Sequence, residues 1–266
     1  MPDVTLERDP DRPHVAHLRV DVDEMNRLTA PRLDAIRDRV AAVPDGVSVL
    51  TVAAAGPLAD ARGLAAGLDL RAAVEFSVAD ARELFETLHE TMTALRAVDA
   101  ATVCCCGGYT IGAGLELALA ADFRVATAEA ALGLPEVDVG IPTVLYGSLL
   151  PLFVGYGDAA ELVFLGDPFP GTRAAEAGLV HEAPPADDYA ETVASYVDAL
   201  AAKSPPVLRH QKRVVRTWRS NGLEAAARGS VGQGLACFAE PDREEAMRAF
   251  LEDREPVWAH ERADDD

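Results

Sequence analysis

The chain has 266 residues, enough for one large domain or for a domain with an appendage, and its 49% hydrophobic content argues against global disorder. Asp and Glu outnumber Lys and Arg by 44 to 24, and the net charge of −20 argues against a nucleic-acid partner, which needs a basic face. No apolar run reaches the roughly 18 residues of a membrane span, and the first residues lack a signal-peptide pattern, so we expect a cytoplasmic protein without a membrane partner.

Lysine is nearly absent from the chain: only Lys203 and Lys212 are lysines, and all the other basic residues are arginines. Abundant Asp, Glu and Ala with almost no Lys is typical of proteins that work in concentrated salt, where self-repulsion is screened. At about 1 M salt the Debye length falls to about 3 Å. We therefore expect a halophilic source, and an acidic enzyme of ordinary salt requirement is the alternative.

The first elements in chain order are two short strands within residues 4–20, joined by a turn at the polar residues 9–13. A helix follows Thr29, a suitable N-cap residue, with Pro31 in its first turn. Residues 46–55 form a continuous apolar and β-branched run. Such a run predicts a strand that is buried on both faces.

The middle of the chain predicts a long helix between buried strands. Residues 78–98 have the spacing of an amphipathic helix, with one apolar stripe formed by Leu84, Leu88, Met92 and Leu95. Strands are predicted at residues 101–106 and 123–126, and residues 139–155 predict a turn followed by a helix. The first of these strands contains three consecutive cysteines, which face alternate sides and cannot converge on one metal ion. We therefore expect no metal site and no disulfide.

The last third of the chain is helical. Helices are predicted at residues 157–165 and 172–178, the second ending at a glycine and leading into a strand. From residue 189 onward the pattern is helical, with interruptions at proline and glycine. The alternation of buried strands and helices before it predicts an α/β fold. We therefore expect a core of residues 1–195 and a helical C-terminal region of residues 196–266.

A glycine-rich turn, Gly112-Ala113-Gly114, separates the strand of residues 101–106 from a short apolar helix. The glycines permit a tight turn and the close approach of a ligand, and the helix leaves its first N–H groups unpaired. The N–H of Ala113 is the natural donor to a developing oxyanion. Taken alone, the turn also fits an ordinary strand–helix connection.

A second possible donor follows the strand of residues 46–55. It is the N–H of Leu68, next to Gly67. The ends of parallel strands lie side by side, so both glycine turns can line one crevice. Together Leu68 and Ala113 would then form a two-donor oxyanion hole.

Two carboxylates accompany these turns. Glu116 lies in the first turn of the apolar helix, where the helix N-terminus favours the ionised form that suits a base. Glu136 follows Pro135 ahead of an apolar run. Taken singly, Glu116 also fits a helix-capping role and Glu136 an exposed loop. As a pair beside an anion-binding turn, they predict an acid–base site.

These residues lie within longer motifs. Gly108-Tyr-Thr-Ile-Gly-Ala-Gly-Leu-Glu116-Leu-Ala-Leu-Ala-Ala-Asp122, followed by Leu134-Pro-Glu136-Val-Asp-Val-Gly-Ile-Pro142, resembles the signature of the crotonase (enoyl-CoA hydratase/isomerase) superfamily. The resemblance covers essentially the whole chain. It extends to four further segments: Asn26-Arg-Leu-Thr, Ala65-Ala-Gly67-Leu-Asp-Leu70, Ala174-Ala-Glu-Ala-Gly178-Leu-Val and Ala249-Phe-Leu-Glu-Asp-Arg-Glu-Pro.

The resemblance implies a core built as a spiral of β–β–α turns and a helical C-terminal region that assembles a homotrimer or a dimer of trimers. It implies an acyl-CoA thioester as substrate and no cofactor. The oxyanion-hole amides fall on Leu68 and Ala113, and the catalytic carboxylates fall on Glu116 and Glu136. Further candidates for the substrate pocket are Gly67, Gly112, Gly114 and Tyr146.

Because many members of the superfamily keep one of the two glutamates or neither, retention of both favours an enoyl-CoA hydratase, which adds water reversibly to a 2-enoyl-CoA and gives a 3-hydroxyacyl-CoA. In this interpretation ionised Glu116 deprotonates water for attack at C3, and protonated Glu136 delivers a proton to C2. An isomerase or an acyl-CoA hydrolase on the same fold is the alternative enzyme. A non-catalytic scaffold is the alternative outside enzymes.

Overall fold

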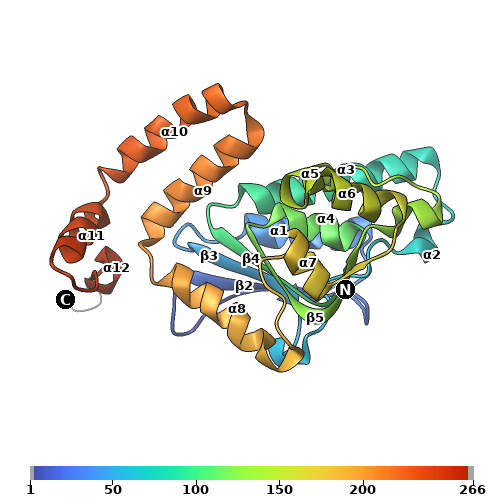
Figure 1. Ribbon diagram of the computed structural model, residues 1–266, viewed down its shortest axis with the longest axis horizontal. Coiled ribbons are helices and arrows are strands. Elements are labelled where there is room, and N and C mark those ends of the chain that lie inside the picture. The colour runs from blue at the N-terminus through green and yellow to red at the C-terminus, as the bar shows by residue number, and fades with distance from the viewer. Residues whose placement is uncertain (1–2, 263–266) are drawn as a thin grey trace.

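A mixed β-sheet organises the fold, which a computed structural model describes for residues 3–262 (Figure 1). The strands lie in chain order across the sheet. β1 pairs antiparallel with β2, the strands from β2 to β5 run parallel, and β6 returns antiparallel to β5. The strands are β1 (Asp3–Arg8), β2 (Val15–Asp21), β3 (Val49–Ala54), β4 (Ala101–Ile111), β5 (Phe123–Gly133) and β6 (Phe169–Pro170).

Helices cover both faces of the sheet (Figure 1). On one face α1 packs against α3 and α3 against α4, while α8 lies across β3, β4 and β5 on the other. The helical elements of this part are α1 (Ala30–Ala41), η1 (Leu58–Asp60), α2 (Leu70–Ala73), α3 (Val78–Ala97), α4 (Ala113–Ala120), η2 (Pro135–Val139), η3 (Tyr146–Leu149), α5 (Leu150–Phe153), α6 (Gly155–Phe164), α7 (Gly171–Ala177) and α8 (Ala186–Ala201). This arrangement confirms the predicted α/β fold.

The central strands are buried on both sides, as their unbroken apolar pattern predicts. Every residue of β3 is buried. Val52 of this strand packs in the cluster beneath α1 and α3, whereas its neighbour Ala53 packs with Tyr189 and Val193 of α8. Neighbouring residues of a strand thus belong to opposite layers of the core.

The long helix α3 follows its predicted limits closely. Ser77 caps it, since the Ser77 hydroxyl accepts a hydrogen bond from the N–H of Asp80 and the Asp80 carboxylate accepts one from the N–H of Ser77. The predicted apolar stripe is buried: Leu84, Leu88, Met92 and Leu95. By contrast, Thr29 is the N-cap residue of α1 but its side chain makes no capping hydrogen bond.

The strands β4 and β5 are both longer than predicted. For β4 the reason is that Gly107 does not end the strand. Gly107 has φ +53°, and the pairing of β4 with β5 shifts register around it. A Cβ at this position would overlap the carbonyl oxygen of Arg62. Gly107 therefore forms a bulge against a neighbouring segment, and the strand continues to Ile111.

The strand predicted after α7 does not form. The segment makes only one isolated bridge, between Val125 and Glu182. Pro184 and Pro185 follow at once, and neither has an N–H with which to extend a ladder of hydrogen bonds. The prediction was wrong at this point.

Beyond α8, a helical arm projects from the body of the molecule (Figure 1). In it α9 and α10 pack against each other. The arm contains α9 (Pro205–Ser220), α10 (Leu223–Cys237), α11 (Pro241–Leu251) and α12 (Ala259–Arg262). The predicted boundary at residue 195 lies within α8, whose side chains pack on the sheet. Among the described helices, none is long and apolar enough to cross a membrane.

Candidate active site

The two glycine turns predicted to line one crevice lie in contact. Gly67 has φ +88° and Gly112 has φ +56°, conformations that glycine adopts readily. A Cβ on Gly67 would lie 3.2 Å from the carbonyl oxygen of Ile111 and 3.8 Å from the Cα of Gly112. The turn after β4 and the loop before α2 therefore meet without a side chain between them.

Leu68 and Ala113 both line the same cavity of about 130 Å³. Within residues 3–262, neither N–H donates a hydrogen bond to the protein. A backbone bridge fixes the segment around Leu68: the N–H of Leu28 donates to Gly67, and the N–H of Asp69 donates to Leu28. Because successive peptide groups of an extended segment point in opposite directions, the N–H of Leu68 points away from Leu28. Two donors are thus available at this cavity.

Glu116 lies on α4, a helix buried along its whole length. Only 3% of the residue is exposed, and its Oε1 accepts a hydrogen bond of 2.9 Å from the N–H of Gly147. Burial raises the pKa of Glu116 to about 7, and the nearby charge of Glu136 acts in the same direction. The helix N-terminus favours the ionised form of Glu116, but burial acts in the opposite direction, so Glu116 is only partly ionised near neutral pH.

Glu136 lies in η2, half-buried, beside the turn at Gly112. Its Oε1 lies 3.0 Å from the place that a Cβ on Gly112 would occupy. Its Oε2 accepts a hydrogen bond of 3.0 Å from the hydroxyl of Thr143. Burial raises the pKa of Glu136 above its ordinary value, and the Thr143 hydroxyl opposes that change. The structure thus brings both predicted glutamates to the turn that presents the amide of Ala113.

The segment from Thr143 to Gly147 takes part in the site, although Tyr146 was its only residue predicted there. The helix α5 begins at Leu150, so the preceding residues are free to contact both carboxylates. The hydrogen bond from Thr143 to Glu136 could have been suspected from the sequence, because a threonine follows this glutamate by seven residues. Nothing local in the sequence indicates the contact between Gly147 and Glu116.

Two predicted pocket residues, Gly114 and Tyr146, do not line the cavity of about 130 Å³. A Cβ on Gly114 would lie 2.6 Å from the carbonyl oxygen of Ala65, so this glycine allows α4 to pack closely on that loop. Tyr146 is buried, and its hydroxyl lies 3.5 Å from the Thr93 hydroxyl of α3. Gly114 and Tyr146 thus lie outside this cavity, whereas Gly67 and Gly112 line it.

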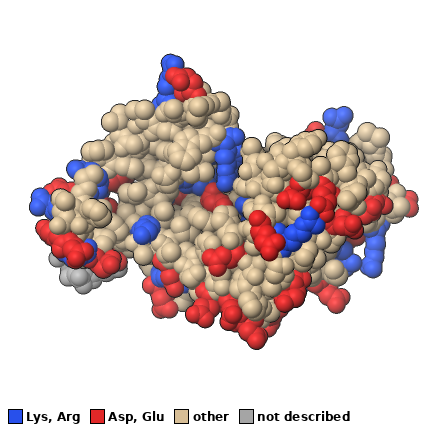
Figure 2. Space-filling view, in the orientation of Figure 1, with Lys and Arg blue, Asp and Glu red and all other residues tan. Residues whose placement is uncertain are grey.

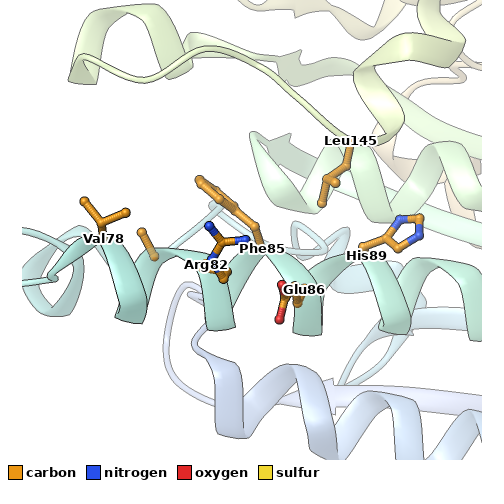
Figure 3. A pocket seen from close by; sticks show the side chains of 7 residues that line it. Val78, Arg82, Phe85, Glu86, His89 and Leu145 are labelled. Atoms are coloured by element: carbon orange, nitrogen blue, oxygen red, sulfur yellow. The ribbon is translucent and has the colours of Figure 1, made fainter.

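A larger groove of about 470 Å³ lies beside this segment (Figure 3). Its floor is α3, with Val78 and His89 near its two ends and Phe85 between them, and Leu145 faces α3 from the segment above (Figure 3). Leu145 is only two residues from Gly147, so the groove adjoins the backbone that holds Glu116. Among the described residues, no group of His, Cys, Asp and Glu side chains is arranged to hold a metal ion.

An α/β fold with two free amides beside a buried and a half-buried carboxylate is the arrangement of an acid–base enzyme, and comparison with known proteins identifies the family. The family model described as enoyl-CoA hydratase/isomerase matches residues 53–261. The chain therefore belongs to the enoyl-CoA hydratase/isomerase family, which confirms the resemblance to the crotonase superfamily.

Several relatives are similar over most of their length. A crotonyl-CoA hydratase from Syntrophomonas wolfei is 29% identical over 233 residues, which are 86% of this chain and 88% of the relative. The 2,3-dehydroadipyl-CoA hydratase of Escherichia coli is 32% identical over 198 residues, 74% of this chain and 77% of that protein. A human mitochondrial enoyl-CoA hydratase domain-containing protein is 34% identical over 199 residues, 73% of this chain and 68% of that protein.

Solved structures share the fold. DspI from Pseudomonas aeruginosa is 27% identical and superposes with a TM-score of 0.86 over 96% of each chain. An enoyl-CoA hydratase from Mycobacterium smegmatis, 24% identical, has a TM-score of 0.87 over 97% of this chain and 99% of its own. These similarities confirm the crotonase-like fold, including the helical C-terminal region.

Proposed function

We propose that this enzyme adds water reversibly to a 2-enoyl-CoA thioester and gives a 3-hydroxyacyl-CoA. The observation that carries the proposal is the placement of two carboxylates, buried Glu116 and half-buried Glu136, at the glycine turn beside the free amides of Leu68 and Ala113. The names of similar proteins support it, since several are hydratases of enoyl-CoA substrates. On this proposal the thioester is the substrate, and no cofactor is needed.

The amides supply the electrophilic half of the mechanism. Addition of water at C3 moves negative charge onto the thioester oxygen, where the N–H groups of Leu68 and Ala113 would receive it. One preorganised donor of this kind is worth about 3–4 kcal/mol of transition-state stabilisation. Because both donors belong to backbone held at glycine turns, they need little reorganisation when the charge develops.

The carboxylates supply the proton transfers. One accepts a proton from water as its oxygen bonds to C3, and the other delivers a proton to C2. The pair therefore holds one proton before and after the step, but on the opposite carboxylate. The active form is the singly protonated pair, whose apparent pKa values belong to both glutamates together.

Crotonyl-CoA is the substrate for the first test. A hydratase removes the absorbance of the conjugated enoyl thioester without releasing free thiol. An isomerase changes that absorbance only with a 3-enoyl substrate or with a mixture of isomers, and a hydrolase releases the coenzyme A thiol. A panel of enoyl-CoA substrates of increasing chain length, assayed in molar salt, would also show whether the groove on α3 sets chain length. Failure of every acyl-CoA to bind would contradict the proposal and favour a non-catalytic scaffold.

We also propose that the helical C-terminal region, predicted at residues 196–266 and including the helical arm, assembles the protein into a homotrimer or a dimer of trimers. Large apolar side chains are exposed along the arm, and in the view of Figure 2 the surface of α9 and α10 is mostly uncharged, whereas charged side chains gather over α11 and α12. The exposed apolar side chains include Leu223, Val231, Leu235, Phe238, Phe250 and Leu251. Exposed apolar surface of this extent is typical of a protein interface. We expect sedimentation velocity to give three or six copies, and a monomer at micromolar concentration would contradict the proposal.

The strongly negative net charge supports the proposal that the protein functions in a cytoplasm rich in salt. Acidic side chains gather along the lower edge of the molecule in Figure 2, and the net charge is −20. We expect both the melting temperature and the hydratase rate to rise between about 0.1 M and about 2 M KCl, since salt screens repulsion among the carboxylates and between protein and coenzyme A. Full stability and turnover in dilute buffer would contradict a halophilic origin.

A further inference from the structure

A single short segment contacts both carboxylates of the site. At its start the Thr143 hydroxyl donates to Oε2 of Glu136 at 3.0 Å, and at its end the N–H of Gly147 donates to Oε1 of Glu116 at 2.9 Å. Thr143 and Gly147 also touch each other, since a Cβ on Gly147 would overlap Cγ2 of Thr143. One side chain is therefore in contact with both halves of the acid–base pair, directly with one and through a glycine with the other.

We propose that Thr143 is a positioning residue that decides which of the two glutamates carries the proton they share, through its hydroxyl at Glu136 and its methyl group against Gly147. The catalytic consequence of this proposal rests on the proposed hydratase function. The assignment of the proton does not, because it follows from the contacts within the protein.

The hydroxyl acts on Glu136. A donor to a carboxylate stabilises the ionised form, and a neutral hydroxyl does so without adding a charge. Glu136 is half-buried, whereas Glu116 is 3% exposed and has a pKa of about 7. The Thr143 hydroxyl therefore favours ionised Glu136, and the deeper burial of Glu116 favours its protonated form.

No basic side chain pairs with either glutamate among the described residues, so the effect of the Thr143 hydroxyl on the ionisation of Glu136 is not masked by a neighbouring cation. Glu116 is close enough to Glu136 for their charges to interact, and Asp138 of the same element lines the same cavity as Glu136. The helix α6, which packs on η2, directs Asp158 and Glu161 to Arg173. Thr143 is thus the side-chain donor that distinguishes Glu136 from its partner.

The methyl group acts on Glu116 through the backbone. Gly147 leaves space that Cγ2 of Thr143 fills, so the methyl group limits how far the peptide of Gly147 can shift. That peptide donates the hydrogen bond to Glu116. The hydroxyl and the methyl group of Thr143 therefore have separable effects, and two substitutions can test them one at a time. Thr143→Val keeps the branched shape without the hydroxyl, and Thr143→Ser keeps the hydroxyl without the methyl group.

The decisive experiment measures the ionisation of Glu136 without any substrate. In an E116Q background, the infrared C=O absorption of protonated carboxyl groups is followed against pH, and the signal of the E116Q/E136Q double variant is subtracted to isolate Glu136. We expect Thr143→Val to move the titration of Glu136 to higher pH and Thr143→Ser to leave it in place. The same titration of Glu136 in E116Q alone and in E116Q combined with Thr143→Val or with Thr143→Ser would overturn the proposal. Thermal unfolding curves confirm that each variant is folded.

Kinetics on the protein with both glutamates gives the second readout. The low-pH limb of kcat reports the first ionisation of the pair, which belongs mainly to Glu136. We expect Thr143→Val to move this limb to higher pH and to lower kcat about tenfold with little change in KM, since a hydrogen bond to a charged group is lost. Thr143→Ser should restore the position of the limb. A lower kcat with an unmoved limb would mean a merely structural threonine, whereas wild-type protein without hydratase activity would refute only the proposed function.

Discussion

Glu116→Gln and Glu136→Gln each lower kcat for the hydration of crotonyl-CoA by about 10²–10⁴-fold with little change in KM. Either substitution leaves the pair with one titratable group, so it can no longer accept a proton from water and deliver another to C2. On the proposed function, the amides of Leu68 and Ala113 and the cavity walls hold the substrate, and glutamine at either position keeps those amides and nearly the same side-chain volume. The loss should therefore fall on the chemical step.

A matched control separates the loss of a catalytic group from the mere removal of one negative charge in this acidic protein. Glu129 is an exposed carboxylate on β5, the strand that precedes η2. Glu129→Gln should keep the wild-type kcat and KM. Full activity of either Glu116→Gln or Glu136→Gln would refute the assignment of both glutamates, because the proposed step uses them as a pair.

The fold could be predicted where local pattern and tertiary environment agree. The stripe on α3 follows from helical periodicity alone, and the double burial of β3 follows from its unbroken apolar run. The limits of β4 were missed because Gly107 was taken as the end of a strand. Its role as a bulge depends on the carbonyl of Arg62, forty-five positions earlier, which no local pattern indicates.

The same distinction holds within the site. The two glutamates and the two glycine turns lie in motifs that the sequence displays, so they could be nominated as a candidate site, and the structure brings the turns into contact. The protonation states of the glutamates could not be predicted, because the helix dipole is a local property and burial is not. The contact of Gly147 with Glu116 spans 31 positions and is made by a backbone group, which leaves no trace in residue type.

Burial of Glu116 also predicts how the stability of the protein depends on pH. The ordinary pKa of a glutamate is near 4.5, and in the folded protein that of Glu116 is about 7. Between these pH values the folded state binds a proton that the unfolded state has released, so Glu116 makes unfolding progressively easier as pH rises. The contribution is fully favourable below about pH 4.5 and is lost once the pH exceeds the folded pKa.

Glu116→Gln removes this dependence. The glutamine oxygen can still accept the hydrogen bond from Gly147, and the side chain has no charge to desolvate. Relative to wild type, the variant should gain about 3 kcal/mol in the free energy of unfolding between about pH 4.5 and about pH 8, measured by denaturant titration at several pH values in constant high salt. Glu129→Gln should show no such trend, and curves for wild type and Glu116→Gln that stay parallel across this range would contradict the raised pKa. A gain in stability together with a large loss of kcat would mean that the protein carries a destabilising carboxylate at neutral pH because the reaction needs a group that can hold or release a proton there.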